Sequence, residues 1–424
     1  MTARSPSPPD RASAAAAFAR RAWAALAFGF LLAFSSAVGQ SYFIGLFGAH
    51  IRETLSLSHG EFGAIYAAAT LASAGALLVT GKLADRLSPH AAGLITAAWL
   101  TAASLIMAHA GHPAVLLLAL FALRLGGQGM MSHIALTTLG RWFTAERGRA
   151  ISLATLGFPA AEAALPPLVA AGLVGLGAKA VWLIAAAVMM LAVAPGLVVL
   201  SRVAQRNLAR AHDEGSGAEA PAHTPSWTRA QVLRDPRFYA IAPSLLAAPF
   251  IVTGIVFHQA RLAQINAWSL TEFAALFPLF AGAAVAGGLA VGAAVDRFGA
   301  RGVLPVFLAP LGAALLVFSL SDALAAAGLA MALMGLTAGG TTVLFGTVWA
   351  ELYGPAHLGA IRALAVSMMV VATALAPAAL GVLIDAGVSL KAQFQALAVY
   401  IVGCIALLLR FRASFTAGDP PYSP

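Results

Sequence analysis

Residues 81–88, GKLADRLS, and residues 292–301, GAAVDRFGAR, share a Gly, an Asp and an Arg at equal spacings. Each stretch follows a long apolar segment, and their aspartates, Asp85 and Asp296, are 211 positions apart. A second pair of basic residues lies at nearly the same offset. Arg149 and Arg362, each near the start of an apolar segment, are 213 positions apart. The chain is therefore built from two halves that repeat one pattern.

The composition indicates a membrane protein. Of the 424 residues, 60% are hydrophobic and only 10% are charged, whereas soluble globular proteins carry about 25% charged residues. The single cysteine, Cys404, excludes a disulfide within the chain and a thiolate metal site. We therefore expect an all-α polytopic membrane protein with no metal and no cofactor.

Twelve apolar segments have about the 20 residues that a helix needs to cross a bilayer. They are residues 22–48, 60–82, 90–110, 113–140, 148–175, 178–201, 238–262, 270–294, 301–321, 323–350, 357–385 and 393–412. A polar stretch rich in Ala, Gly, Ser and Pro separates the sixth from the seventh, as is typical of a flexible linker. The predicted organisation is a disordered tail at 1–21, six-helix bundles at 22–201 and 238–412, a linker at 202–237 and a tail at 413–424.

The basic residues predict the orientation. With the N-terminus in the cytoplasm, 20 of the 25 Lys and Arg residues fall in inner segments, and four fall in outer segments. This bias is the positive-inside rule, and it explains the net charge of +9 without any nucleic-acid partner. Both termini and the linker are therefore expected in the cytoplasm, with the lipid bilayer as the surrounding partner.

The repeated loop resembles the signature G-x-L-x-D-R-x-G-R-R of the major facilitator superfamily. The first copy matches at Gly81, Leu83, Asp85 and Arg86, with Ser88, Pro89 and His90 in place of the Gly and the basic pair. The second copy matches at Gly292, Asp296, Arg297, Gly299 and Arg301. The stretch RWFTAERGRA at 141–150 and the PRF opening of the seventh segment look like carriers of the monocarboxylate and oxalate–formate type.

The resemblance implies two six-helix bundles related by pseudo-twofold symmetry around a central cavity, with access alternating between the two sides. It also implies a monomer in a bacterial inner membrane. The loop residues then suit a gate, in which Asp meets a helix N-terminus and Arg meets a carboxylate while the inner side is closed. The gate candidates are Asp85, Arg86, Glu146, Asp296 and Arg297. The alternative is that these charges only set the topology.

Two strong charges lie well inside the predicted spans: Arg124 in the fourth and Glu162 in the fifth. Counted from the inner ends at 1.5 Å per residue, their depths are roughly 24 and 20 Å, so an ion pair is expected. Such a pair could lock the two helices together. Because buried pairs seldom stabilise better than apolar residues, and because intramembrane charges usually mark a substrate or proton path, we favour a functional role.

Other polar residues are weaker candidates for the cavity or for gates. Gln128 shares a helical face with Arg124, in a segment similar to the R-x-x-Q-G motif of proton-coupled carriers but one residue longer. Gln40 interrupts the first apolar segment. His258 and Gln259 suit either an outer gate or the headgroup region, and Thr341 suits either substrate binding or close helix packing.

No catalytic or ATP-binding motif is present, so we expect a secondary transporter rather than an enzyme or an ATP-driven pump. The favoured cargo is a small organic anion, such as a monocarboxylate, coupled to protons or moved by exchange. The alternative is proton-driven efflux of a drug or amphipathic metabolite, for which lipophilic compounds would compete for the cavity. A third possibility is a membrane sensor that binds a solute without moving it.

Overall fold

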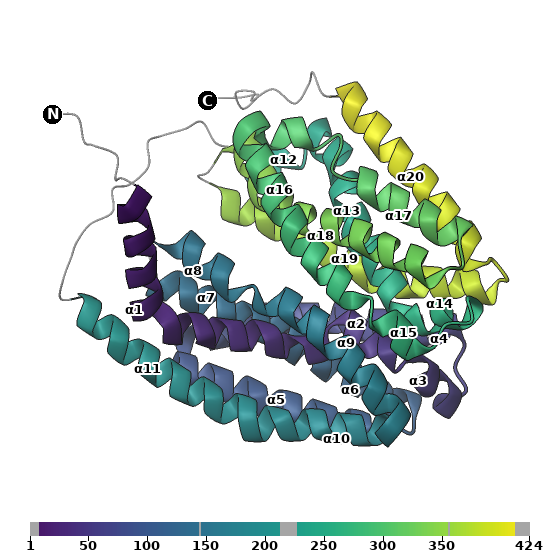
Figure 1. The fold of residues 1–424 in the computed structure, drawn as a ribbon, viewed down its shortest axis with the longest axis horizontal. Coiled ribbons are helices and arrows are strands. Elements are labelled where there is room, and N and C mark those ends of the chain that lie inside the picture. The colour runs from purple at the N-terminus through teal and green to yellow at the C-terminus, as the bar shows by residue number, and fades with distance from the viewer. Residues whose placement is uncertain (1–7, 144–145, 213–226, 355–356, 412–424) are drawn as a thin grey trace.

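A computed structural model describes residues 8–143, 146–212, 227–354 and 357–411 of the chain. These residues form helices joined by short turns, with no strand among them, and Figure 1 shows their arrangement. Eleven segments of the described chain are long and apolar enough to cross a membrane. The remaining predicted span, the ninth, is the shorter apolar helix α17 (Ala309–Leu320). The prediction of an all-α polytopic fold with twelve helical spans is confirmed.

Several spans of the N-terminal half consist of consecutive helical pieces. The first is α1 (Pro8–Ser35), η1 (Ser36–Gly39) and α2 (Ser41–Leu46), followed by α3 (Gly48–Leu55). The second and third are α4 (His59–Arg86) and α5 (Pro89–Ala108). The fourth is α6 (Pro113–Leu123), η2 (Arg124–Met131) and α7 (Ser132–Trp142). The fifth is α8 (Arg147–Ala154) and α9 (Gly157–Leu176), and the sixth is α10 (Ala178–Val188), η3 (Met189–Val193) and α11 (Ala194–His212).

The C-terminal half begins with the short helix α12 (Arg229–Val232). Its seventh span is α13 (Pro236–Phe257), followed by the short helices α14 (Gln259–Ile265) and α15 (Leu270–Ala274). The later spans are α16 (Phe277–Val303), α17, α18 (Leu324–Tyr353), α19 (Leu358–Asp385) and α20 (Leu390–Phe411).

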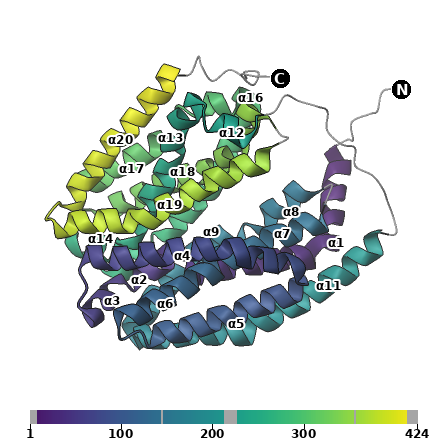
Figure 2. The same cartoon turned by 180° about the vertical axis from the view of Figure 1, so that it is seen from behind.

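The two halves form bundles that lie side by side, as Figures 1 and 2 show from opposite sides. They pack against each other through α4 with α19, α9 with α16 and α2 with α13. We call the end where α1 begins and α20 ends the terminal end, and the opposite end the distal end. In both views the bundles converge at the distal end and diverge toward the terminal end.

Two boundaries differ from the sequence prediction. Helix α1 begins at Pro8, inside the segment predicted as a disordered tail, because the run of alanines before Phe18 has a high helix propensity. Helix α11 continues to His212, so the first part of the predicted linker is helical. The centre of that linker, residues 213–226, and the tail from 412 onward lie outside the described residues.

Candidate functional site

Arg124 is buried in the fourth span, with 1% of its surface exposed. Its Nε donates to Thr70 Oγ1 at 3.2 Å, and its Nη1 donates to the Gly39 carbonyl at 2.9 Å. Its Cζ lies 5.2 Å from the centroid of the Tyr66 ring, which is a cation–π geometry. Nη2 is buried and has no hydrogen-bond partner among the described residues. Neutral acceptors and an aromatic ring thus accommodate the charge, and one guanidinium nitrogen remains available.

The predicted ion pair between Arg124 and Glu162 does not form in this conformation. The π-helical segment η2, which carries Arg124, packs mainly against α4 and η1, whereas α9, which carries Glu162, packs mainly against α16 and α1 and less closely against η1. Equal depth on consecutive spans does not fix the direction in which a side chain points around its helix. Glu162 is half-buried instead, near Tyr42 in the second part of the first span.

A break in the first span provides the carbonyl that Arg124 binds. The chain passes through the 3₁₀ segment η1, and Gln40 then adopts an extended backbone before α2 begins. Gly39 and Gly127 allow this segment to touch the fourth span, since a Cβ on Gly39 would overlap the Leu123 carbonyl and one on Gly127 would lie 2.7 Å from Gly39 Cα. This glycine contact places the Gly39 carbonyl at the guanidinium. Gln40, which follows it, is half-buried.

The fourth span changes helix type at Arg124. Residues Arg124–Met131 form a π-helix, in which each hydrogen bond encloses one residue more than in an α-helix. Such a segment accommodates a single inserted residue, so it accounts physically for the spacing from Arg124 to Gln128, which is one longer than in the motif it resembles. Gln128 is half-buried within this segment. Because π-helical turns often occur at functional sites, the π-helix supports a functional role for the segment that carries Arg124 and Gln128.

His258 and Gln259 lie at the distal end, buried between helices. Gln259 is fully buried and its Nε2 donates to the Tyr42 carbonyl at 2.7 Å, which joins the two halves. His258 Nε2 lies 2.9 Å from the Pro377 carbonyl within the C-terminal half. Both side chains are therefore positioned at the contact between the bundles, as the gate alternative requires, rather than toward the membrane surface.

Thr341 lies in the opposite half from Arg124, and its hydroxyl donates to the Thr337 carbonyl of its own helix at 2.7 Å. Nearby glycines bring α18 against α16, because a Cβ on Gly335 or Gly339 would overlap the Phe280 or Ala284 carbonyl. This arrangement favours the packing alternative for Thr341 over substrate binding.

The gate candidates lie at the terminal end. Asp296 is exposed and has no hydrogen bond or ion pair within the described part of the chain. Arg297 is also exposed, with its guanidinium 5.2 Å from the Phe298 ring. Arg86 is exposed, Glu146 precedes α8, and the side chain of Asp85 lies outside the described residues. The exposure of Asp296 is the state expected of a gate residue when its end of the molecule is open.

One acidic residue at this end was not identified from the sequence. Glu351 pairs with Arg301, and its Oε2 accepts from the Ala300 amide at 2.6 Å. Gly299, which directly precedes Ala300, has a φ of 73°, which a residue with a side chain adopts only with strain. Glu351 lies two residues after Trp349 and Glu146 lies four residues after Trp142, so both repeats carry an acidic residue after this tryptophan, which was the available signal for Glu351.

Replacing Asp296 by asparagine should shift the conformational balance toward the state seen here. The side chain has no described partner to lose in this state, whereas a charge at a helix N-terminus in the other state is worth about 0.3–1 kcal/mol, or roughly 2- to 5-fold. Maleimide labelling of a cysteine placed at the terminal end measures the shift, with Asp322→Asn as the control at the distal end. Unchanged labelling would show that Asp296 is only a topology-setting charge.

A family model described as Major Facilitator Superfamily matches residues 29–260, which is more than half of the chain. An "Uncharacterized 38 kDa protein in 23S RNA operon" of Thermoproteus tenax is 27% identical over 309 residues, covering 71% of this chain and 72% of that protein.

Solved transporter structures share the fold at low identity. The nucleoside transporter NupG aligns with a TM-score of 0.66 and 14% identity, over 94% of this chain and all of that chain. A bacterial homologue of the human lysosomal transporter Spinster, in an inward-facing and unoccupied conformation, aligns with a TM-score of 0.61 and 16% identity, over 95% of this chain and 99% of that chain. At these identities the similarity shows the fold alone.

Proposed function

Because the chain belongs to the major facilitator superfamily and is a secondary transporter, we propose that its cargo is a small organic anion such as a monocarboxylate. The observation that carries this proposal is the unpartnered Nη2 of Arg124. A buried guanidinium with a free donor is suited to a carboxylate, because charge-assisted hydrogen bonds to carboxylates are among the strongest in proteins. Gln40 directly follows Gly39, whose carbonyl binds Arg124, and Gln128 lies four residues after Arg124 in the same span. Both side chains are half-buried and supply neutral polar groups.

The proposal includes an orientation in the membrane. The chain spans a bacterial inner membrane with both termini in the cytoplasm, because its positive charges then gather on the inner side. With this topology the distal end faces outward, and the structure corresponds to an inward-facing state. Alternating access then requires the distal contacts to open and the exposed Asp296 region to close.

Glu162 is the proposed proton acceptor. It lies in the interior of the fifth span, whereas other acidic residues of the described spans lie near span ends. Ionisable residues inside the membrane commonly belong to proton paths. Uptake of one proton by Glu162 for each bound anion leaves the charge of the loaded carrier unchanged, which supports either symport or proton-linked exchange.

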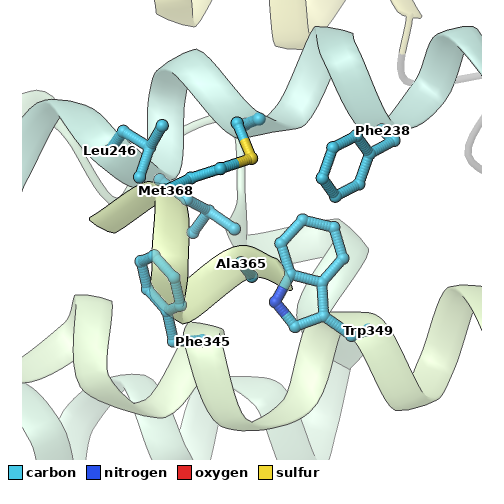
Figure 3. Close-up of a pocket in the computed structure, with 8 residues that line it drawn as sticks. Phe238, Leu246, Phe345, Trp349, Ala365 and Met368 are labelled. Carbon is cyan, nitrogen blue, oxygen red and sulfur yellow. The ribbon is translucent and has the colours of Figure 1, made fainter. Parts of the chain in front are cut away.

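A second candidate is proton-driven efflux of an amphipathic compound, and one pocket supports it. The pocket lies between α13, α18 and α19 toward the terminal end, and Figure 3 shows its aromatic and aliphatic side chains. The labelled lining residues are Phe238, Leu246, Phe345, Trp349, Ala365 and Met368. Trp349 Nε1 is buried there without a partner among the described residues. An apolar wall with one donor has the chemistry that a hydrophobic cargo needs, but the pocket encloses only about 180 Å³ in this conformation and would have to widen to hold one.

Thermal shift with matched ligand pairs separates the two candidates. Carboxylates such as acetate, lactate and benzoate should raise Tm by roughly 2–5 °C at saturating concentration, because binding to the folded state stabilises it. Their neutral amides serve as controls of equal shape and should have little effect. Counterflow of the best ligand in proteoliposomes then tests transport. Stabilisation by lipophilic cations, with none by carboxylates, would support efflux and contradict the organic-anion proposal.

A further inference from the structure

Asp385, the last residue of α19, contacts the first residues of α4 across the boundary between the halves. Its Oδ1 accepts from the His59 amide at 3.1 Å, and its Oδ2 accepts from the Gly60 amide at 2.7 Å. The carboxylate therefore caps a helix of the other bundle at the distal end. We call these two hydrogen bonds the Asp385 cap.

The start of α4 also has a local cap, and Asp385 complements it. Ser58 Oγ accepts from the Glu61 amide, and Glu61 Oε2 accepts from the Ser58 amide. This reciprocal pair leaves the amides of His59 and Gly60 without a partner inside their own helix. Asp385 satisfies both of them, so the N-terminus of α4 is fully capped only when the halves are together.

The position of Asp385 is unfavourable for its own helix. A negative charge at the C-terminus of α19 opposes the helix dipole, whereas the same charge is favourable at the N-terminus of α4. Local structure thus gives no reason for an aspartate here. The favourable interaction exists only across the boundary between the halves.

Glycines allow the two helices to approach closely enough for the cap. A Cβ on Gly60 would lie 2.8 Å from Asp385 Oδ2, and one on Gly63 would lie 2.6 Å from the Pro377 carbonyl. On the other helix, a Cβ on Gly381 would overlap the His59 carbonyl. Three glycines from both halves therefore shape this contact.

Basic residues from both halves surround the cap. Arg52 of α3 and Arg261 of α14 line one small pocket, together with His59 and His258. The pKa of Arg52 lies below its ordinary value because of partial burial and then because of Arg261, while Asp385 acts in the opposite direction. Closure of the distal end thus brings like charges together, and Asp385 offsets their repulsion.

We propose that the Asp385 cap holds the distal end closed and sets the balance between the two access states of the transporter. The proposal does not depend on the identity of the cargo. When the halves separate at the distal end, the amides of His59 and Gly60 lose their acceptor, and solvent must replace it.

Distance measurements between spin labels test this role. With Cys404→Ser as background, labels at Thr54→Cys and Val388→Cys report the separation of the halves at the distal end, since both sites are exposed there. Asp385→Asn keeps one oxygen acceptor but loses the charge and the second acceptor, so it should increase the ratio of distal-open to distal-closed molecules by about 2- to 5-fold, the range expected for a charge at a helix N-terminus. A distance distribution identical to that of the parent protein would overturn the proposal.

Three further variants control the measurement. Asp322→Asn removes an aspartate that pairs with Lys391 inside the C-terminal half, and it should leave the distances unchanged. Asp385→Glu retains the charge and should recover most of the closed state. Adding Arg261→Gln to Asp385→Asn should partly restore closure, because it removes one of the facing positive charges. If Asp322→Asn opened the distal end as much as Asp385→Asn, the specific role of the cap would be refuted.

Discussion

Replacing Arg124 by lysine should weaken binding of a carboxylate cargo by about 10- to 150-fold while the helical content stays unchanged. Lysine keeps the positive charge, but it has one nitrogen where arginine has a planar set of donors. That single ammonium cannot bond Gly39, bond Thr70 and present a further nitrogen in the geometry seen for Arg124. The lost charge-assisted hydrogen bond is worth about 1.5–3 kcal/mol, which gives the expected change.

Binding isotherms and counterflow rates measure this effect with the best ligand of the thermal-shift series. Arg202→Lys, an exposed exchange on α11, is the matched control and should behave as the parent protein. Full affinity in the Arg124→Lys variant would mean that the anionic group of the cargo binds elsewhere.

Replacing Glu162 by glutamine should abolish accumulation driven by a proton gradient while exchange of cargo continues. Glutamine resembles the protonated acid in shape and charge but cannot release a proton. In the absence of an ion pair with Arg124, this variant leaves the hydrogen bonds of the guanidinium in place. We expect accumulation to fall to the level seen without a pH gradient, because no proton is then carried with the cargo.

Proteoliposomes with an imposed pH gradient measure accumulation, and the same vesicles without a gradient measure exchange. Glu53→Gln, at an exposed position of α3, serves as the control. Undiminished accumulation by Glu162→Gln would place proton coupling at another residue or remove it from the mechanism.

The sequence predicted the spans and the two halves because both depend on patterns that are local in the chain. A run of apolar residues requires only about 20 positions, and the Asp85 and Asp296 loops repeat at a nearly constant offset. The prediction of a disordered start was less successful. Alanine-rich residues before Phe18 extend α1, since helix propensity continues beyond the apolar segment.

The partners of Arg124 could not be predicted in the same way. Depth along a helix can be counted, but the direction of Glu162 around α9 depends on packing between helices. The acceptor at Gly39 is a backbone carbonyl, and its availability depends on the break at η1. The Asp385 cap is still less visible in the sequence, because it joins a side chain to amides 325 and 326 positions away.

The contacts of Arg124 tie its positive charge to one half of the molecule. Gly39, Tyr66 and Thr70 all belong to the N-terminal half, so the positive charge moves with that half as a unit. In the C-terminal half, residues 238–257 of α13 and 324–350 of α18 contain no charged side chain. If the cargo binds Arg124 as proposed, its charged group would therefore also move with the N-terminal half, and the C-terminal half would offer it neutral groups from these two segments.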